Sequence, residues 1–139
     1  MTNLTAFLAQ NKIKKENIKF IASKSFVDEN GKPIEWEIKA ITSVENDAIK
    51  KECTKRVKVK NSYVLETDVD LYVGKLAAAC TVFPDLKNAE LQNSYGVMGE
   101  DQLLKTMLSV GEYTEYTNKV SAINGFDTSI DEAVEQAKN

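Results

Sequence analysis

Two carboxylates lie in the first third of the chain at a spacing that suits acid–base chemistry. Glu35 and Glu37 stand two residues apart in a segment with a β pattern, so their side chains share one strand face about 7 Å apart. Paired carboxylates at such a separation can act as general acid and general base. The same spacing is typical of a solvated strand face, which we favour because Lys24 is expected on the neighbouring strand. An enzyme that works with carboxylates alone stays open as an alternative.

The other side chains offer little further chemistry. The chain of 139 residues has no histidine, which removes Ser-His-Asp and Cys-His catalysis and histidine metal ligation. Cys53 and Cys80 lie far apart in helical patterns, and we predict buried thiols rather than a disulfide or a reactive nucleophile. Asp68 and Asp70 suit the first turn of a helix, where carboxylates favour the helix dipole without any metal. The sequence therefore predicts a non-enzymatic protein without a metal or cofactor.

A β pattern runs from Ile18 to Ile41 and indicates a hairpin. Asn30-Gly31 lies at its centre, and a two-residue Asn-Gly loop favours a type I′ turn because both residues tolerate positive φ. This turn sets a definite register. The predicted pairs are Val27 with Ile34, Ser23 with Ile38, Lys24 with Glu37 and Glu29 with Lys32.

Helix signals surround this hairpin on both sides. Asn3 can cap a short N-terminal helix, and Thr42 followed by Glu45 is a capping-box pattern for a helix through about Lys55. Alternation at Val57 and Val59 then predicts a third short strand.

The second half of the chain is helical in pattern. An apolar stripe predicts a long helix that starts with Thr67 as its cap and continues to Phe83, where Pro84 stops it. Short helices follow over 88–95 and after Gly99. A last helix, marked by Tyr113, Tyr116, Val120 and Ile123, ends with Gly125 in the C-cap position. The fold class is therefore α+β, a small antiparallel sheet with a C-terminal helical half and five or six helices in all.

Composition indicates a single domain of ordinary character. The chain is 42% hydrophobic with a net charge of −3, and no apolar run approaches the length of a membrane helix. We predict one domain over 1–126, with an α/β half at 1–66 and a helical half at 67–126. Residues 127–139 form an acidic, flexible tail in which Ile130 and Val134 recur at helical spacing. The N-terminus lacks the charge order of a secretory signal, so a cytosolic protein is expected.

One apolar cluster in the helical half suggests a contact with a partner. Two adjacent leucines on a short helix span a wide arc, and methionine adapts to irregular apolar partners. Tyrosines of the kind enriched in interfaces follow shortly after. The predicted partner-binding residues are Leu103, Leu104, Met107, Leu108, Tyr113 and Tyr116, together with Ile130 and Val134 of the tail.

A basic segment gives the second candidate function. Between Lys50 and Lys60 six basic side chains stand against a single Glu52, and such a segment can contact nucleic-acid phosphates. However, it lacks interleaved aromatics and belongs to an acidic chain. We favour a solvated basic face, which can also receive an acidic tail of this or another chain.

The order and wording of several segments resemble the XkdN-like tail assembly chaperones of tailed phages and PBSX-type prophages. The segments are LTAFLAQN, GKPIEWEIKAIT, FPDLKNAELQNSYGV, LLKTML and GEYTEYTNKVSAINGF, which together cover the chain from about Leu4 to Phe126. One departure is Val110, where the resemblance leads us to expect proline.

The resemblance implies a non-structural protein of tail morphogenesis. Such chaperones hold the tape-measure protein soluble, help tube subunits polymerise around it, and are absent from the finished tail. The expected partners are therefore the tape-measure protein and the tail tube protein, with no membrane and no nucleic acid. The expected location is the cytoplasm of the host cell.

Overall fold

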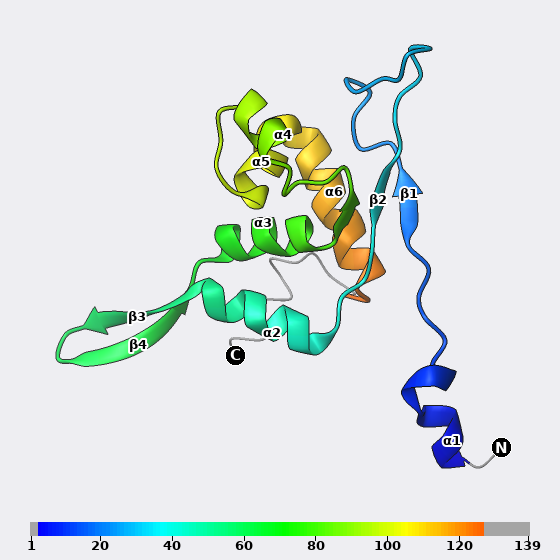
Figure 1. Ribbon diagram of the computed structural model, residues 1–139. Helices are drawn as coiled ribbons and strands as arrows, with labels where there is room; N and C mark the ends of the chain where they lie inside the picture. Colours follow the sequence, from blue (N-terminus) through cyan, green and yellow to red (C-terminus); the bar gives the residue numbers. More distant parts are fainter. Residues whose placement is uncertain (1–2, 127–139) are drawn as a thin grey trace.

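The computed structural model describes residues 3–126, and its elements follow the order seen in Figure 1. Within these residues there are six α-helices, one short 3₁₀ helix and five strands. Their bounds are α1 Asn3–Phe7, η1 Ala9–Asn11, β1 Ile18–Phe20, β2 Trp36–Ile38, α2 Ser43–Glu52, β3 Thr54–Val59, β4 Ser62–Thr67, α3 Val69–Ala79, β5 Thr81–Phe83, α4 Ala89–Ser94, α5 Glu100–Met107 and α6 Val110–Ile123.

The main sheet has three antiparallel strands in the order β1-β2-β5. Strand β1 pairs with β2 so that Ile18 lies opposite Ile38 and Phe20 lies opposite Trp36. The predicted hairpin exists, but its predicted register is wrong, because Ile38 faces Ile18 and not Ser23. The salt-bridge partner changes accordingly, since Lys19 and not Lys24 faces Glu37.

The turn at the tip accounts for one residue of this five-residue shift. The other four come from the unequal arms between the tip and the ladder, residues 21–26 on one side and 34–35 on the other. Gly31 has φ of 79° while Asn30 keeps an ordinary negative φ, so the loop is not a type I′ turn. The Asp28 amide donates to the Lys32 carbonyl at 2.8 Å, and the Gly31 amide donates to the Asp28 carbonyl at 3.0 Å. This is a three-residue loop with a bulged glycine, which sets a different register from a two-residue loop. Between this tip and β1–β2 the chain makes only an isolated bridge, Val27 to Pro33.

The third strand of the sheet comes from a segment that we expected to be helical. Helix α3 ends at Ala79, and Thr81–Phe83 then forms β5 beside β2, with the Lys39 amide donating to the Cys80 carbonyl at 2.8 Å. The predicted third strand, around Val57, instead pairs with β4 in a separate two-stranded hairpin. The helix cap also differs from the prediction, because the Asp68 side chain, and not Thr67, accepts from the Leu71 amide at 3.1 Å.

Two other helix-end predictions are confirmed. Thr42 and Glu45 form both hydrogen bonds of a capping box at the start of α2. Gly125, just beyond α6, has φ of 81°, as its predicted capping role requires. Helix α6 begins at Val110, where Ser109 and Glu112 form a second capping box that was not predicted from the sequence. The amide at the first helical position has no partner within the helix, so proline is favourable there but not required. Valine at this position therefore leaves the helix intact.

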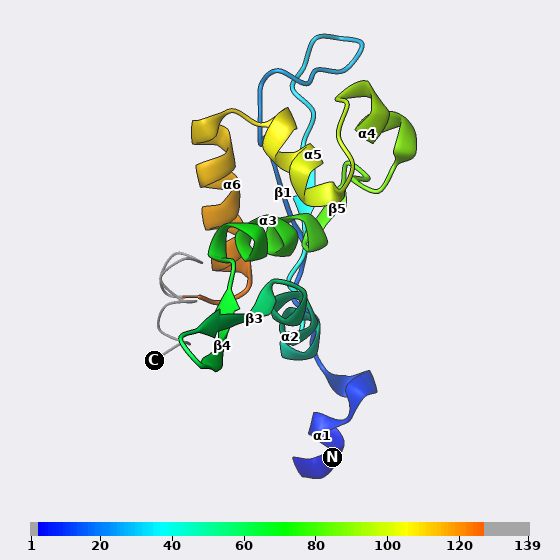
Figure 2. The ribbon, with the colours of Figure 1, turned by 90° about the vertical axis from the view of Figure 1, so that its left-hand side faces the viewer.

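One hydrophobic core joins the sheet to the helices. In both views α3 lies between α5 and α2 (Figures 1 and 2), and in Figure 1 α6 lies beside the strands. The core combines Trp36 and Ile38 of β2 with Leu76 of α3 and Val120 of α6. The α+β fold with a helical C-terminal half is therefore confirmed. The predicted domain limits stay a prediction.

Both cysteines lie in this core, as predicted. Cys53 is 1% exposed and Cys80 is 0% exposed, and both thiols are free. Burial raises the pKa of each thiol, which keeps it protonated and unreactive. No helix within residues 3–126 is long and apolar enough to cross a bilayer.

Candidate partner-binding surfaces

The predicted α5–α6 cluster is mostly core. Leu103 and Leu104 are 0% exposed, Tyr116 is 1% exposed and Leu108 is 5% exposed, so these side chains offer no surface in this conformation. Met107 and Tyr113 are half-buried at the rim. The partner-binding role predicted for this cluster stays a prediction.

Close helix packing explains the burial. Helix α5 lies directly on α3, where a Cβ at Gly74 would come within 3.4 Å of the Asp101 Cβ. The wide arc that Leu103 and Leu104 span therefore faces neighbouring helices of the same chain. Ile130 and Val134, the other predicted contacts, lie outside the described residues.

Tyr116 has a structural task in that core. Its ring lies 5.5 Å from the Trp36 ring in an edge-on arrangement and 5.5 Å from the Phe20 ring. Its hydroxyl lies 2.6 Å from the Thr81 hydroxyl, which also donates to the Ala77 carbonyl at 2.8 Å. Since a threonine hydroxyl has one hydrogen, Tyr116 must be the donor to Thr81. This residue thus connects α6 to β1, β2 and β5.

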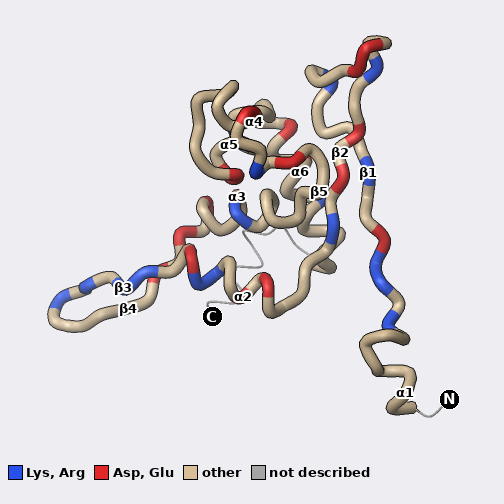
Figure 3. Tube along the Cα trace, in the orientation of Figure 1, with Lys and Arg blue, Asp and Glu red and all other residues tan. Residues whose placement is uncertain are grey.

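The β3–β4 hairpin is the first surface that projects from the body. It extends beyond α2 and α3 in Figure 1, and Figure 3 shows its cations along β3. Opposite residues put Arg56 with Leu65 and Lys58 with Tyr63 on one face. Leu65 is 74% exposed and Tyr63 is 59% exposed, although the Arg56 guanidinium lies 4.8 Å from the Tyr63 ring. An isolated two-stranded hairpin with exposed apolar side chains is a plausible contact element.

The structure divides the predicted basic segment between two elements. Lys50 and Lys51 lie in the last turn of α2, where cations stabilise the helix dipole. The remaining cations belong to the hairpin and its turn: Lys55, Arg56, Lys58 and Lys60.

The N-terminal segment is the second projecting surface. Helix α1 stands apart from the body in both ribbon views (Figures 1 and 2). Leu4 is 75% exposed, Phe7 is 85% exposed and Leu8 is 42% exposed. Leu4 and Phe7 share one face of α1 by their spacing, and Leu8 follows the helix in extended backbone. Ile13 beyond it is 92% exposed. The segment is tied to the body further along, where the Lys15 ammonium donates to the Ile123 carbonyl at 3.2 Å.

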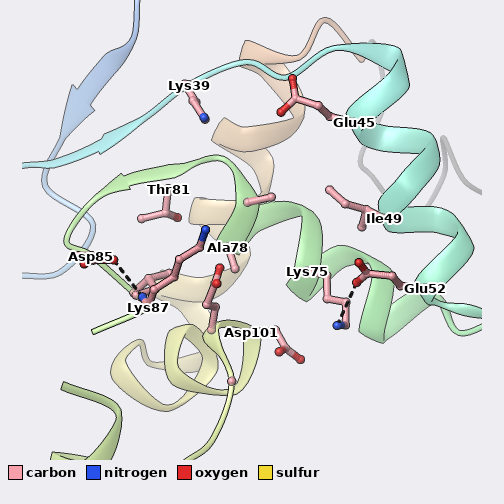
Figure 4. Close-up of a pocket in the computed structure, with 14 residues that line it drawn as sticks. Lys39, Glu45, Ile49, Glu52, Lys75, Ala78, Thr81, Asp85, Lys87 and Asp101 are labelled. Carbon is pink, nitrogen blue, oxygen red and sulfur yellow. Dashed lines mark hydrogen bonds and ion pairs between the residues drawn. The ribbon is translucent and has the colours of Figure 1, made fainter. Parts of the chain in front are cut away.

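A charged cleft between α2, α3 and α5 is the third surface. Its volume is about 660 Å³. The Lys75 ammonium and the Glu52 carboxylate lie 3.2 Å apart at its edge (Figure 4), and this hydrogen bond raises the pKa of Lys75. The charged residues that line it are Lys39, Lys75, Lys87, Glu45, Glu52, Asp85, Glu100 and Asp101. Charged side chains of both signs surround a small apolar area in this cleft. It therefore suits a polar partner segment better than an apolar one.

One carboxylate of each pair considered for chemistry has a structural partner. The Glu37 carboxylate accepts from the Asn17 amide at 2.7 Å and lies 4.0 Å from the Lys19 ammonium. Asp68 caps α3, as described above. Within residues 3–126 no group of three or more Cys, Asp or Glu side chains is placed to hold a metal ion.

Comparison with known proteins identifies the family. The sequence matches, over residues 4–138, the model of a family described as "Phage XkdN-like tail assembly chaperone protein". The chain belongs to the XkdN-like phage tail assembly chaperone family. This confirms the family that the sequence segments suggested.

Relatives of this chaperone family in Bacillus subtilis strain 168 are similar over nearly their whole length. YqbN is 35% identical over 139 residues, covering 99% of this chain and 93% of YqbN. The phage-like element PBSX protein XkdN is 34% identical over 139 residues, covering 99% of this chain and 94% of XkdN. The crystal structure of YqbN matches with a TM-score of 0.78 at 33% identity, covering 91% of this chain and 99% of that chain.

Proposed function

We propose that this chain is a non-enzymatic chaperone that binds the tape-measure protein and assists assembly of the tail tube around it. It acts in the cytoplasm of the host cell and is absent from the finished virion. Membership of a tail assembly chaperone family, together with similarity to a PBSX protein, is the observation that carries this proposal. The tail tube protein is the second expected partner.

The N-terminal segment is the surface that we assign to the client. Its apolar side chains, Leu4 and Phe7 of α1 and Leu8 just after it, are exposed and lie on a segment that stands away from the body. A helix of five residues gains little stability by itself, so it benefits from packing against a helical client. A contact between one such segment and the tape-measure protein is weak. Many chaperone copies bound along one long tape-measure protein together keep it soluble.

The decisive experiment is co-expression with the tape-measure protein encoded in the same phage genome. Soluble co-purification of the client with the wild-type chain is the expected result. The variant Leu4→Asp/Phe7→Asp should fold, because neither side chain is packed in the core, and should lose the client.

Val44→Asp is the matched control, since Val44 is 79% exposed on α2 and lies outside the N-terminal segment. If the wild type, Leu4→Asp/Phe7→Asp and Val44→Asp all keep the client soluble, the assigned surface is refuted but the proposed function is not. Failure of the wild-type chain to bind or solubilise the client would refute the function itself. Circular dichroism confirms that each variant is folded.

A further inference from the structure

One face of the β3–β4 hairpin carries two parallel rows of side chains. Arg56 and Lys58 form a cationic row on β3, and Leu65 and Tyr63 form an apolar row opposite them on β4. Neighbours within a row are about 6.6 Å apart because they stand two residues apart on a strand. Within residues 3–126, neither Arg56 nor Lys58 has a carboxylate within ion-pair distance.

The hairpin is positive on an acidic chain. From Thr54 to Thr67 there are four basic side chains and one carboxylate, a net charge of +3, although the whole chain has a net charge of −3. Like charges close together on one face repel each other, so an acidic partner stabilises the arrangement. The face therefore fits a segment with an apolar row beside an acidic row.

The sequence of this chain contains such a segment after Phe126. Written as a helix, residues 130–135 place Ile130 and Val134 in one row and Asp131 and Glu135 in the row beside it. Helical neighbours four residues apart are about 6 Å apart, which matches the spacing along the hairpin rows. From 127 to 139 there are four carboxylate side chains and one lysine, a net charge of −3 that balances the hairpin.

Geometry decides which copy supplies this segment. Phe126 lines a small cavity with Thr42 at the N-terminus of α2, where the Asn124 side chain accepts from the Ile41 amide at 3.0 Å. The hairpin leaves the opposite end of α2 (Figure 1), about 15 Å from Thr42 and about 9 Å from Asn46, which also lines the cavity. Leu65 lies about 7 Å further along β4. Ile130 is four residues beyond Phe126 and reaches only about 14 Å when fully extended.

We propose that this hairpin face binds the C-terminal segment 127–139 of a second copy of the chain. The acidic row lies on Arg56 and Lys58, and the apolar row lies on Leu65 and Tyr63. The two contacting surfaces are different, and each copy carries one of each. The hairpin of one copy therefore binds the segment of the next, and copies associate head to tail. Such a row of copies spaces the chaperone along a long client, which extends the proposed function but does not depend on it.

Charge exchange in the full-length chain tests this proposal without any client. The first variant, Arg56→Glu/Lys58→Glu, reverses the hairpin row, and the second, Asp131→Lys/Glu135→Lys, reverses the C-terminal row. Sedimentation velocity measures self-association from roughly 10 µM to 1 mM, the range of weak transient contacts. We expect the wild type to associate, and its dissociation constant to rise about tenfold or more between about 20 mM and about 500 mM NaCl.

Each single reversal should abolish association, because like charges then meet. The chain carrying both reversals should associate again, as should an equimolar mixture of the two reversed chains. Lys12→Glu/Lys14→Glu is the matched control, since it changes the same charge at exposed residues outside the hairpin and should leave association intact. Circular dichroism shows whether each variant is folded, and recovery in the doubly reversed chain excludes misfolding as the cause of loss.

A spin label identifies the contact surface. Ala133→Cys provides one accessible thiol, because the native Cys53 and Cys80 are buried. In a mixture of labelled chain and ¹⁵N-labelled chain, we expect broadening of the amides of Lys58 and Tyr63 on the other copy. Broadening within one copy only, a wild type that stays monomeric, or hairpin shifts that appear only with an added oligonucleotide would each overturn the proposal.

Discussion

Replacement of Leu104 by alanine tests whether α5 belongs to the core or to a partner surface. Leu104 is 0% exposed, and its substitution removes three carbons from a packed interior. The lost transfer free energy is about 2.4 kcal/mol at about 0.8 kcal/mol per buried CH₂. A residual cavity of roughly 50 Å³ adds about 1 kcal/mol. We expect the free energy of unfolding to fall by about 3–4 kcal/mol, a large part of the 5–15 kcal/mol typical of a domain.

Urea unfolding followed by tryptophan fluorescence measures this change. Trp36 is the single tryptophan of the chain, is 2% exposed and lies 5.5 Å from the Tyr116 ring, so its emission reports the core. With a slope of about 2 kcal/mol per M, the midpoint should fall by roughly 1.5–2 M. Val44→Ala, at an exposed position of α2, should change the stability by less than about 0.5 kcal/mol. A Leu104→Ala midpoint within about 0.3 M of the wild type would refute the burial of α5.

Three further predictions concern the helix ends and the buried polar groups. Burial raises the pKa of Tyr72 from 10.0 to about 12. The neutral phenol therefore stabilises the fold fully below about pH 10, and this contribution is lost as the pH rises toward about 12. The urea midpoint should fall between about pH 10 and about pH 12, and it should fall less in the Tyr72→Phe variant. Thr42→Ala removes one half of the α2 capping box and should cost about 1 kcal/mol in a thermal unfolding experiment, and an unchanged melting temperature would contradict the cap. Cys53 and Cys80 should react with an aromatic disulfide reagent only as fast as the protein unfolds, and rapid labelling of either thiol in the native protein would count against its burial.

Features set by a few neighbouring residues were predictable from the sequence. The α2 capping box needs only Thr42 and Glu45, and the C-terminal end of α6 needs only a glycine that tolerates positive φ. The burial of both cysteines followed from their place in helical patterns. These features depend on interactions within about one helical turn, so the rest of the fold does not alter them.

Strand pairing could not be predicted in the same way. The segment Thr81–Phe83 continues the apolar stripe of α3, but it becomes a strand because β2 offers an unpaired edge to it. The register of β1 on β2 depends mainly on residues 21–26, which make one arm of the hairpin four residues longer than the other, and less on the loop in which Gly31 alone has positive φ. Local periodicity shows neither the distant partner of β5 nor this irregular arm, so it cannot fix the pairing.

The burial of most of the predicted partner-binding cluster could not be seen in the sequence for a related reason, and its partner-binding role stays a prediction. Adjacent leucines on one short helix require two neighbours, and the sequence does not show whether those neighbours come from the same chain. Here α3 and the rest of the core provide them. The two projecting segments carry exposed apolar side chains, beside single ones elsewhere such as Val44, Met98 and Val110. Folding and partner contact therefore rest on different residues. A substitution at Phe7 or Leu65 should change binding without changing stability, while one at Leu104 should change stability first.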